Sequence, residues 1–172
     1  MNRRLSRSRG VTDFEALYRS SRDDVYAYVA TLMRDRYAAE DVTAQAFERA
    51  YRKRASFRPG RGSPRAWLFG IARNAALDEL RRRARTTPVA AEPADDAALG
   101  PDDEAETGAR RLAVRAALHS LQPRERELVA LKFFAGLSNA ELASVLGTSE
   151  TNVGTRLHRA IHKLREACHE TA

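Results

Sequence analysis

A segment without positive charge near the middle of the chain constrains the fold most strongly. Residues Thr86 to Ala109 contain no lysine or arginine, but they hold seven acids and three of the six prolines. Such a composition cannot bury enough apolar surface to offset the entropy lost on ordering. We therefore expect a flexible acidic linker over residues 86–108. It either acts as a tether that sets the spacing of two domains, or is simply a solvated connection between them.

The two flanking parts are basic and long enough for two small domains. The chain has 172 residues, a net charge of +7 and 43% hydrophobic residues, which suffices for a core. A basic chain favours an acidic partner, and nucleic acid is the commonest one. The N-terminal "MNRRLSRSRG" lacks the apolar core of a signal peptide, so we expect a disordered basic tail over residues 1–11. Because no apolar run approaches the ~20 residues of a membrane span, we expect a cytoplasmic protein without direct membrane insertion.

The C-terminal part, residues 109–169, has the pattern of a helix-turn-helix domain. Pro123 suits the first turn of one helix and Gly136 its end. Ser138 and Glu141 have capping-box spacing at the start of a short helix. Gly147 then allows a left-handed turn before the last helix, which Thr148 or Ser149 would cap.

The last helix has two distinct faces. Val153, Leu157, Ala160, Ile161 and Leu164 recur at helical spacing and are expected to pack inward. The remaining side chains are cationic or can form hydrogen bonds, as recognition of a major groove requires. A short helix, a tight turn and a longer basic helix together predict DNA binding. The other interpretation is a solvated basic face on a helical bundle.

Metal binding and catalysis are not expected. His158 and His162 lie one helical turn apart, but only Cys168 and His169 are nearby as further ligands. Cys168 is the only cysteine, so an internal disulfide is excluded. We find no carboxylate cluster, P-loop or paired nucleophile and base. The sequence therefore predicts a protein that is not an enzyme and has no metal or cofactor.

The N-terminal part, residues 12–85, is also predicted to be helical, which makes the chain all-α. Thr12 and Glu15 have capping-box spacing at the start of the first helix. A second helix is expected from about Tyr37 to Arg54, with an apolar inner face. Its outer face either is ordinary solvated surface or docks a protein partner. The inner-facing residues would be Ala39, Val42, Ala46, Phe47 and Ala50.

An arginine-bearing loop precedes the third helix of this part. Residues 58–65 contain two glycines, two prolines and three arginines, and Ser63 and Pro64 suit a helix start. Arginines beside Trp67 and Asn74 favour binding of single-stranded nucleic acid, because arginine binds phosphate and a loop can hold an unstacked base. Trp67 can also be interpreted as a core residue. The later segment "RRRAR" can also be interpreted as a solvated helix end.

Three motifs in this order resemble bacterial sigma factors of the extracytoplasmic-function (ECF) type, within the sigma-70 family. The motif "AAEDVTAQAFERAY" resembles the helix that binds the polymerase clamp. The motif "SPRAWLFGIARNAALDELRRR" resembles the helix that melts and recognises the −10 promoter element. The segment "LQPRERELVALKFFAGLSNAELASVLGTSETNVGTRLHRAIHKLRE" resembles the domain that recognises the −35 element. The acidic segment lies where the family has its inter-domain linker.

The resemblance implies a transcription initiation factor. Such a protein binds the clamp and flap regions of core RNA polymerase, contacts duplex DNA at −35 and the melted strand at −10, and is typically held by an anti-sigma factor. It associates with the nucleoid when bound to polymerase. The C-terminal domain alone would also fit a helix-turn-helix regulator that is not a polymerase subunit. Co-purification with core polymerase would distinguish a sigma factor from such a regulator.

The resemblance also implies three sets of contact residues. We name them the clamp set, the −10 set and the −35 set. The clamp set is Asp41, Val42, Gln45, Phe47, Glu48 and Tyr51, of which Phe47 also fits a core position. The −10 set is Arg58, Arg61, Ser63, Arg65, Trp67, Arg73 and Asn74. The −35 set is Asn152, Gly154, Thr155, Arg156, His158 and Arg159.

The chain differs from the family pattern at three places. Ala44 and Gln45 stand where the clamp motif often has Gln-Glu. The loop "RPGRGSP" is richer in proline and glycine than is usual. Gly154 stands where the family often has lysine or arginine, and a glycine inside a helix costs about 1 kcal/mol relative to alanine.

Overall fold

The computed structural model describes the backbone of residues 3–86 and 105–170, and side chains within 14–86 and 112–168. All regular structure in these ranges is helical, which confirms the predicted fold class. The N-terminal domain contains α1 (Arg3–Met33), α2 (Arg36–Lys53), the short 3-10 turns η1 (Arg54–Ser56) and η2 (Pro59–Arg61), and α3 (Pro64–Thr86). The C-terminal domain contains α4 (Ala105–Ser120), α5 (Pro123–Phe133), α6 (Asn139–Leu146) and α7 (Glu150–Glu170).

The N-terminal domain is a three-helix unit in which α1, α2 and α3 all contact one another. Val25, Tyr28 and Val29 of α1 pack with Leu68 and Phe69 of α3 in its centre. The predicted inner face of α2 is buried over its whole length. Small alanines on α2 and α3 let the helix backbones approach closely, and the aromatic rings of Tyr28 and Phe69 meet edge to face at 5.7 Å between centroids.

A sharp corner separates α1 from α2. Arg34 adopts a positive φ of 55°, and Asp35 then caps α2 by accepting a hydrogen bond from the Ala38 amide at 3.1 Å. A carboxylate at this position satisfies a free amide of the first turn and interacts favourably with the helix dipole. The corner therefore sets the antiparallel packing of α1 and α2.

The helix-turn-helix is formed as predicted. Ser138 and Glu141 make both hydrogen bonds of the capping box at the start of α6, and Gly147 ends α6 with a left-handed φ of 65°. Ser149, rather than Thr148, caps α7 by accepting from the Asn152 amide at 3.2 Å. Val153, Leu157 and Ala160 of α7 are buried.

The structure differs from the sequence-based boundaries at two places. Helix α1 begins at Arg3, so residues 3–11, predicted as a disordered tail, continue the first helix instead of preceding a cap at Thr12. Helix α4 begins at Ala105, so the last four residues of the predicted linker are helical. Thr86, the first residue of that linker, ends α3, and residues 87–104 lie outside the described residues.

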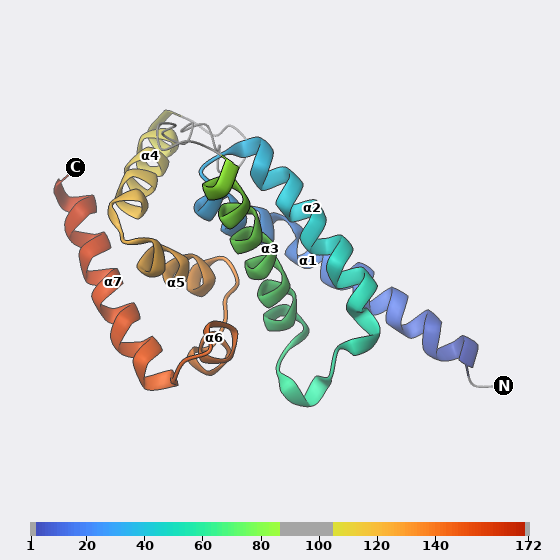
Figure 1. The fold of residues 1–172 in the computed structure, drawn as a ribbon. Helices are drawn as coiled ribbons and strands as arrows, with labels where there is room; N and C mark the ends of the chain where they lie inside the picture. The colour runs from blue at the N-terminus through green and yellow to red at the C-terminus, as the bar shows by residue number, and fades with distance from the viewer. Residues whose placement is uncertain (1–2, 87–104, 171–172) are drawn as a thin grey trace.

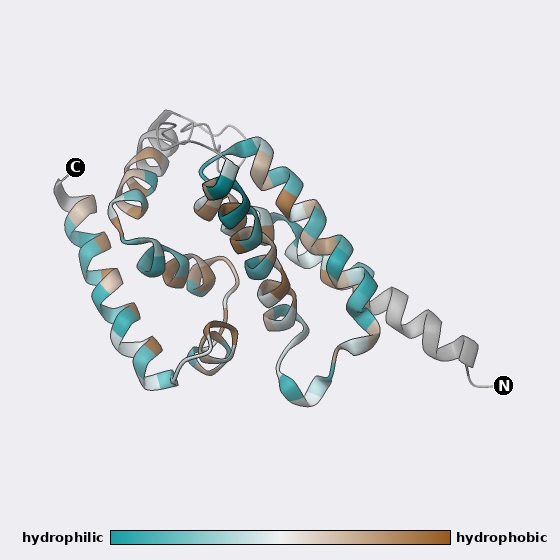
Figure 2. Cartoon of the chain, in the orientation of Figure 1, coloured by the Kyte–Doolittle hydropathy of each residue, from teal (hydrophilic) through white to brown (hydrophobic). Residues whose placement is uncertain are grey.

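The two domains pack against each other. Figure 1 shows α5 and α6 beside α1 and α3, and the contacts are mainly those of α1 with α5 and of α3 with α6. Figure 2 shows apolar residues gathered on the inner sides of both helix groups. Buried side chains of the two domains form one connected cluster. We call this arrangement the closed form.

Candidate nucleic-acid interface

The −35 set lies mainly on the solvent side of α7. Thr155, His158 and Arg159 are exposed, above the buried stripe of Val153 and Leu157. The Thr155 hydroxyl donates to the Thr151 carbonyl at 3.1 Å, which leaves its oxygen free to accept. This face therefore presents donors, acceptors and an exposed arginine, the kinds of group that recognition of a major groove uses.

Three other members of the −35 set have different surroundings. Asn152 is exposed, and its amide donates to the Thr148 hydroxyl at 2.7 Å across the turn. Arg156 is half-buried and lines a cavity between the domains. Gly154 has open space beside it: a Cβ there would meet nothing closer than the Asn139 side-chain nitrogen at 3.9 Å.

The clamp set divides into an exposed and a buried group. Asp41, Gln45, Glu48 and Tyr51 lie on the outer face of α2. Val42 and Phe47 are 1% and 7% exposed, so they pack in the core and position α2, and an edge of Phe47 also lines the groove described below. Phe47 packs edge to face against Tyr18 at 4.8 Å between centroids. A shallow groove of about 460 Å³ beside this face is lined by residues of α1 and α2, among them Tyr18, Tyr26 and Ala44.

Part of the −10 set is exposed around the arginine loop. Arg58 and Arg61 lie on the loop of η2, and Asn74 lies on the open side of α3. Trp67 is half-buried, with its ring against Phe57 at 5.6 Å between centroids. Trp67 thus belongs partly to the core, as one of its two interpretations predicts, while Arg58 and Arg61 are free to meet phosphate.

The other −10 residues contact the C-terminal domain. The Ser63 hydroxyl donates to the Glu141 carboxylate at 2.5 Å, and the Arg73 Nε donates to the Glu127 carboxylate at 2.6 Å. The Arg65 guanidinium donates to two carbonyls of the α5 end, those of Phe134 at 2.8 Å and Ala135 at 2.5 Å. The structure therefore separates the predicted −10 set into exposed residues and residues held by the other domain.

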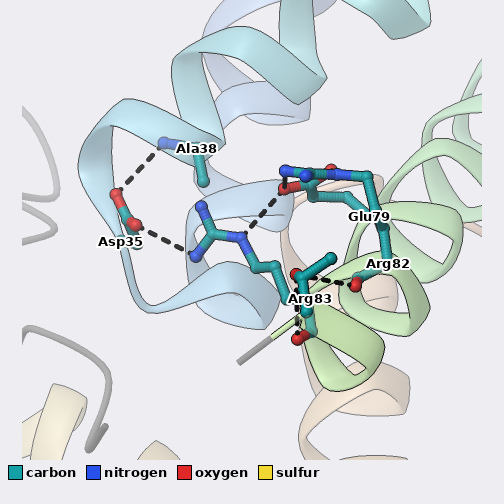
Figure 3. Close-up of polar contacts among 6 residues, drawn as sticks. Asp35, Ala38, Glu79, Arg82 and Arg83 are labelled. Atoms are coloured by element: carbon teal, nitrogen blue, oxygen red, sulfur yellow. Dashed lines mark hydrogen bonds and ion pairs between the residues drawn. The ribbon is translucent and has the colours of Figure 1, made fainter. Parts of the chain in front are cut away.

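A charge network that no sequence motif indicates fixes the arginines near the end of α3 (Figure 3). The Glu79 carboxylate accepts from Arg82 at 2.7 Å and from Arg83 at 2.9 Å, and Arg83 donates to Asp35 at 3.0 Å. Hydrogen bonds from Arg82 and then Arg83 lower the pKa of Glu79 to about 2. The Ala38 amide, followed by Arg83, lowers the pKa of Asp35. Arg82 and Arg83 are thus neutralised within the domain rather than forming a free basic end.

Comparison with known proteins finds a family match for each of the two domains. The Sigma-70 region 2 model matches residues 17–86, and the Sigma-70 region 4 model matches residues 111–164. The ECF RNA polymerase sigma factor SigL of Mycobacterium tuberculosis is 31% identical over 87% of this chain and 85% of its own length. This chain belongs to the ECF sigma factors of the sigma-70 family.

Other relatives support the assignment of this chain to the ECF sigma factors. CarQ, an RNA polymerase sigma factor of Myxococcus xanthus, is 35% identical over 89% of this chain and 87% of its own length. The ECF sigma factor BldN of Streptomyces coelicolor is 33% identical over 88% of this chain, which spans 58% of BldN. The predicted alternative, a regulator outside polymerase, does not account for the match over residues 17–86.

Two solved sigma factor structures resemble the whole chain. The sigma factor RpoE in complex with the anti-sigma factor NepR from Bartonella quintana aligns with a TM-score of 0.69 and 26% identity, covering 90% of this chain and 96% of that one. CnrH in complex with the cytosolic domain of CnrY aligns with a TM-score of 0.66 and 25% identity, covering 92% and 89%. Both alignments extend over the two domains of the sigma factor.

Other kinds of site are not found in the described part of the molecule. Within the described residues, no three His, Cys, Asp or Glu side chains are grouped so that they could hold a metal ion. Among the helices described here, none is both long and apolar enough to cross a bilayer. Sigma factors are known as transcription initiation factors without catalytic activity of their own.

Proposed function

We propose that the two domains of this sigma factor divide promoter recognition between them. The N-terminal domain binds the clamp of core polymerase through Asp41, Gln45, Glu48 and Tyr51 and meets the melted −10 strand through the −10 set. The C-terminal domain binds the flap and inserts α7 into the major groove of the −35 duplex. The observation that carries this division is the exposed α7 face of Thr155, His158 and Arg159 over a buried apolar stripe.

The test is transcription from the promoters that the holoenzyme binds, mapped across the genome and then used in run-off assays with core polymerase. Arg159→Ala should reduce promoter-specific transcription about tenfold to a hundredfold, the cost of one good base or phosphate contact. Core binding should be unchanged, because Arg159 is exposed and outside the clamp set. Arg165→Ala is the matched control, since Arg165 is an exposed arginine of the same helix outside the −35 set. Equal losses in both variants would contradict the proposed role of α7.

We also propose that an anti-sigma factor binds this chain. The structural neighbours RpoE and CnrH were both solved with such partners or their domains, and their similarity extends over both domains. The chain itself supplies no chemistry in this scheme: polymerase forms the phosphodiester bonds. Affinity purification of the full chain should recover core polymerase together with a separate inhibitory protein, and recovery of neither would refute the proposal.

A further inference from the structure

A cavity between the two domains combines apolar walls with several arginines that have no acidic partner among the described residues. Its volume is about 430 Å³, within the roughly 300–1,000 Å³ that is typical of small-molecule sites. It is formed by helices that Figure 1 shows around α5. The apolar side chains that line it are Leu32, Leu77, Leu80, Pro123 and Leu146. The charged ones are Arg73, Arg124, Arg126, Glu127 and Arg156.

The only carboxylate in the described lining is already neutralised. Glu127 accepts from the Arg73 Nε at 2.6 Å, and the two side chains are 11% and 23% exposed. Glu125, on the same helix, pairs instead with Lys163 at 2.6 Å. The hydrogen bond from Lys163 contributes most to the lowered pKa of Glu125, and the charge of Arg156 contributes least. Within the described residues, the cavity is therefore lined by three arginines that form no ion pair: Arg124, Arg126 and Arg156.

Arg126 is the most buried of these three arginines, at 9% exposed. Its Nε and Nη2 donate to the carbonyls of Leu118, His119 and Leu121. Its Nη1 carries two more N–H donors and makes no hydrogen bond to any described residue. Burial, followed by the neighbouring charge of Arg34, lowers the pKa of Arg126. Buried donors normally have a partner, so an anion in the cavity would supply the missing acceptor.

The composition of the lining selects the class of ligand. The guanidinium fork matches phosphate oxygens, and three unpaired cations favour an anion with several charges. A carboxylate carries one charge, so it would leave two guanidiniums without a counter-charge. Inorganic phosphate would leave the leucine walls without a contact, and a DNA duplex is too wide for a cavity of this size. Phosphates attached to an aromatic group would use both the arginines and the apolar walls.

We propose that this cavity binds a small polyphosphate attached to an aromatic body, the chemistry of a nucleoside polyphosphate. The phosphates bind the Arg126 Nη1 and the guanidiniums of Arg124 and Arg156, and the aromatic body packs against Leu77 and Leu80. Because α3 belongs to one domain and α5 and α7 belong to the other, the ligand contacts both. The inference goes beyond the proposed function and does not depend on it.

The main test is binding of ATP to the free, full-length chain, measured by isothermal titration calorimetry without magnesium so that the phosphates keep their charge. Inorganic triphosphate and adenosine are the matched halves of this probe. ATP should bind at one site per chain and about tenfold more tightly than inorganic triphosphate, because its base buries apolar surface. Adenosine alone should bind more weakly than ATP. Equal affinity for inorganic triphosphate would mean general attraction of polyanions to a basic chain and would overturn the proposal.

Arg124→Gln and Arg156→Gln test the arginines. Neither side chain makes a hydrogen bond to the described residues, so both variants should fold. Each should weaken ATP binding about tenfold, the effect of losing a hydrogen bond to a charged group. Arg165→Gln is the matched control, because it removes the same charge from an exposed position of α7 outside the cavity and should change the affinity less than about twofold. Equal losses in all three variants would refute a site in the cavity.

Leu77→Ala tests the apolar wall. Leu77 lines the cavity but does not belong to the core cluster, so its loss should leave the fold intact. It should weaken binding of ATP about threefold to tenfold and leave binding of inorganic triphosphate unchanged. An equal effect on both probes would contradict the proposed position of the base. If ATP does not bind and Arg124→Gln instead weakens binding of duplex DNA, these arginines serve DNA and the proposal is wrong.

Discussion

The network around Glu79 makes a quantitative prediction about stability and pH. Glu79→Gln removes the carboxylate that accepts from Arg82 and Arg83 but keeps the size of the side chain. A pKa lowered from 4.5 to about 2 corresponds to at most about 3.5 kcal/mol of stabilisation, at about 1.4 kcal/mol per pH unit. Since the Arg82 side chain is 60% exposed, solvent screening reduces this value. We expect a loss of about 1–2 kcal/mol at pH 7.

The sign of the pH dependence follows from the direction of the pKa shift. A carboxyl group whose pKa is lower in the folded state stabilises the fold at pH values above its unfolded pKa. For Glu79 this contribution is complete above about pH 4.5 and disappears as the pH falls toward 2. The difference between the parent and Glu79→Gln should therefore be constant from pH 7 to about 5 and should shrink below that.

The assay is urea denaturation followed by the fluorescence of Trp67, the only tryptophan of the chain, which lies on α3 of the same domain. Glu40→Gln is the control, since Glu40 makes an exposed i, i+4 pair with Arg36 at 3.0 Å and should contribute less than about 0.5 kcal/mol. A Glu79→Gln effect no larger than this control, or one that stays constant down to pH 3, would refute the reasoning.

Three further predictions concern the C-terminal domain and can be measured by denaturation followed by circular dichroism. Gly154→Ala should stabilise it by up to about 1 kcal/mol, because the position is helical and has open space beside it. Destabilisation would mean that the added methyl group clashes with a neighbour and would contradict the prediction. Gly147→Ala should destabilise it by about 1 kcal/mol, because φ is 65° there, and an unchanged midpoint would contradict the turn geometry. Arg126→Met should cost about 2–4 kcal/mol, because its bonds to the carbonyls of Leu118, His119 and Leu121 hold the end of α4; a smaller loss would mean that water replaces them.

Features encoded within a few residues could be predicted from the sequence. The capping box of Ser138 and Glu141, the left-handed Gly147 and the buried stripe of α7 each follow from local spacing. The Glu79–Arg82–Arg83 cluster also has i, i+3 and i, i+4 spacing, so its pattern was available in the sequence. The hydrogen bond from Arg83 to Asp35 could not be predicted from local spacing, because the two residues are 48 positions apart.

Features that depend on tertiary packing could not be predicted in this way. Val42 and Phe47 fit a contact motif, but the packing of α1 on α2 buries both. Arg65 and Arg73 were expected to meet DNA, since a cation in a helix pattern does not indicate which partner neutralises it. The carboxylates that pair with them in the closed form are distant in the sequence: Asp24 lies 41 residues before Arg65, and Glu127 lies 54 residues after Arg73.

The closed form affects the two promoter surfaces differently, and this asymmetry constrains the order of binding. Thr155, His158 and Arg159 remain exposed on α7, whereas Ser63, Arg65 and Arg73 are engaged. The closed form therefore leaves α7 open to duplex DNA, but of the −10 set only Arg58, Arg61 and Asn74 are exposed. If the −10 set binds the melted strand as we propose, Ser63 and Arg73 must first leave Glu141 and Glu127, because one donor cannot serve both partners.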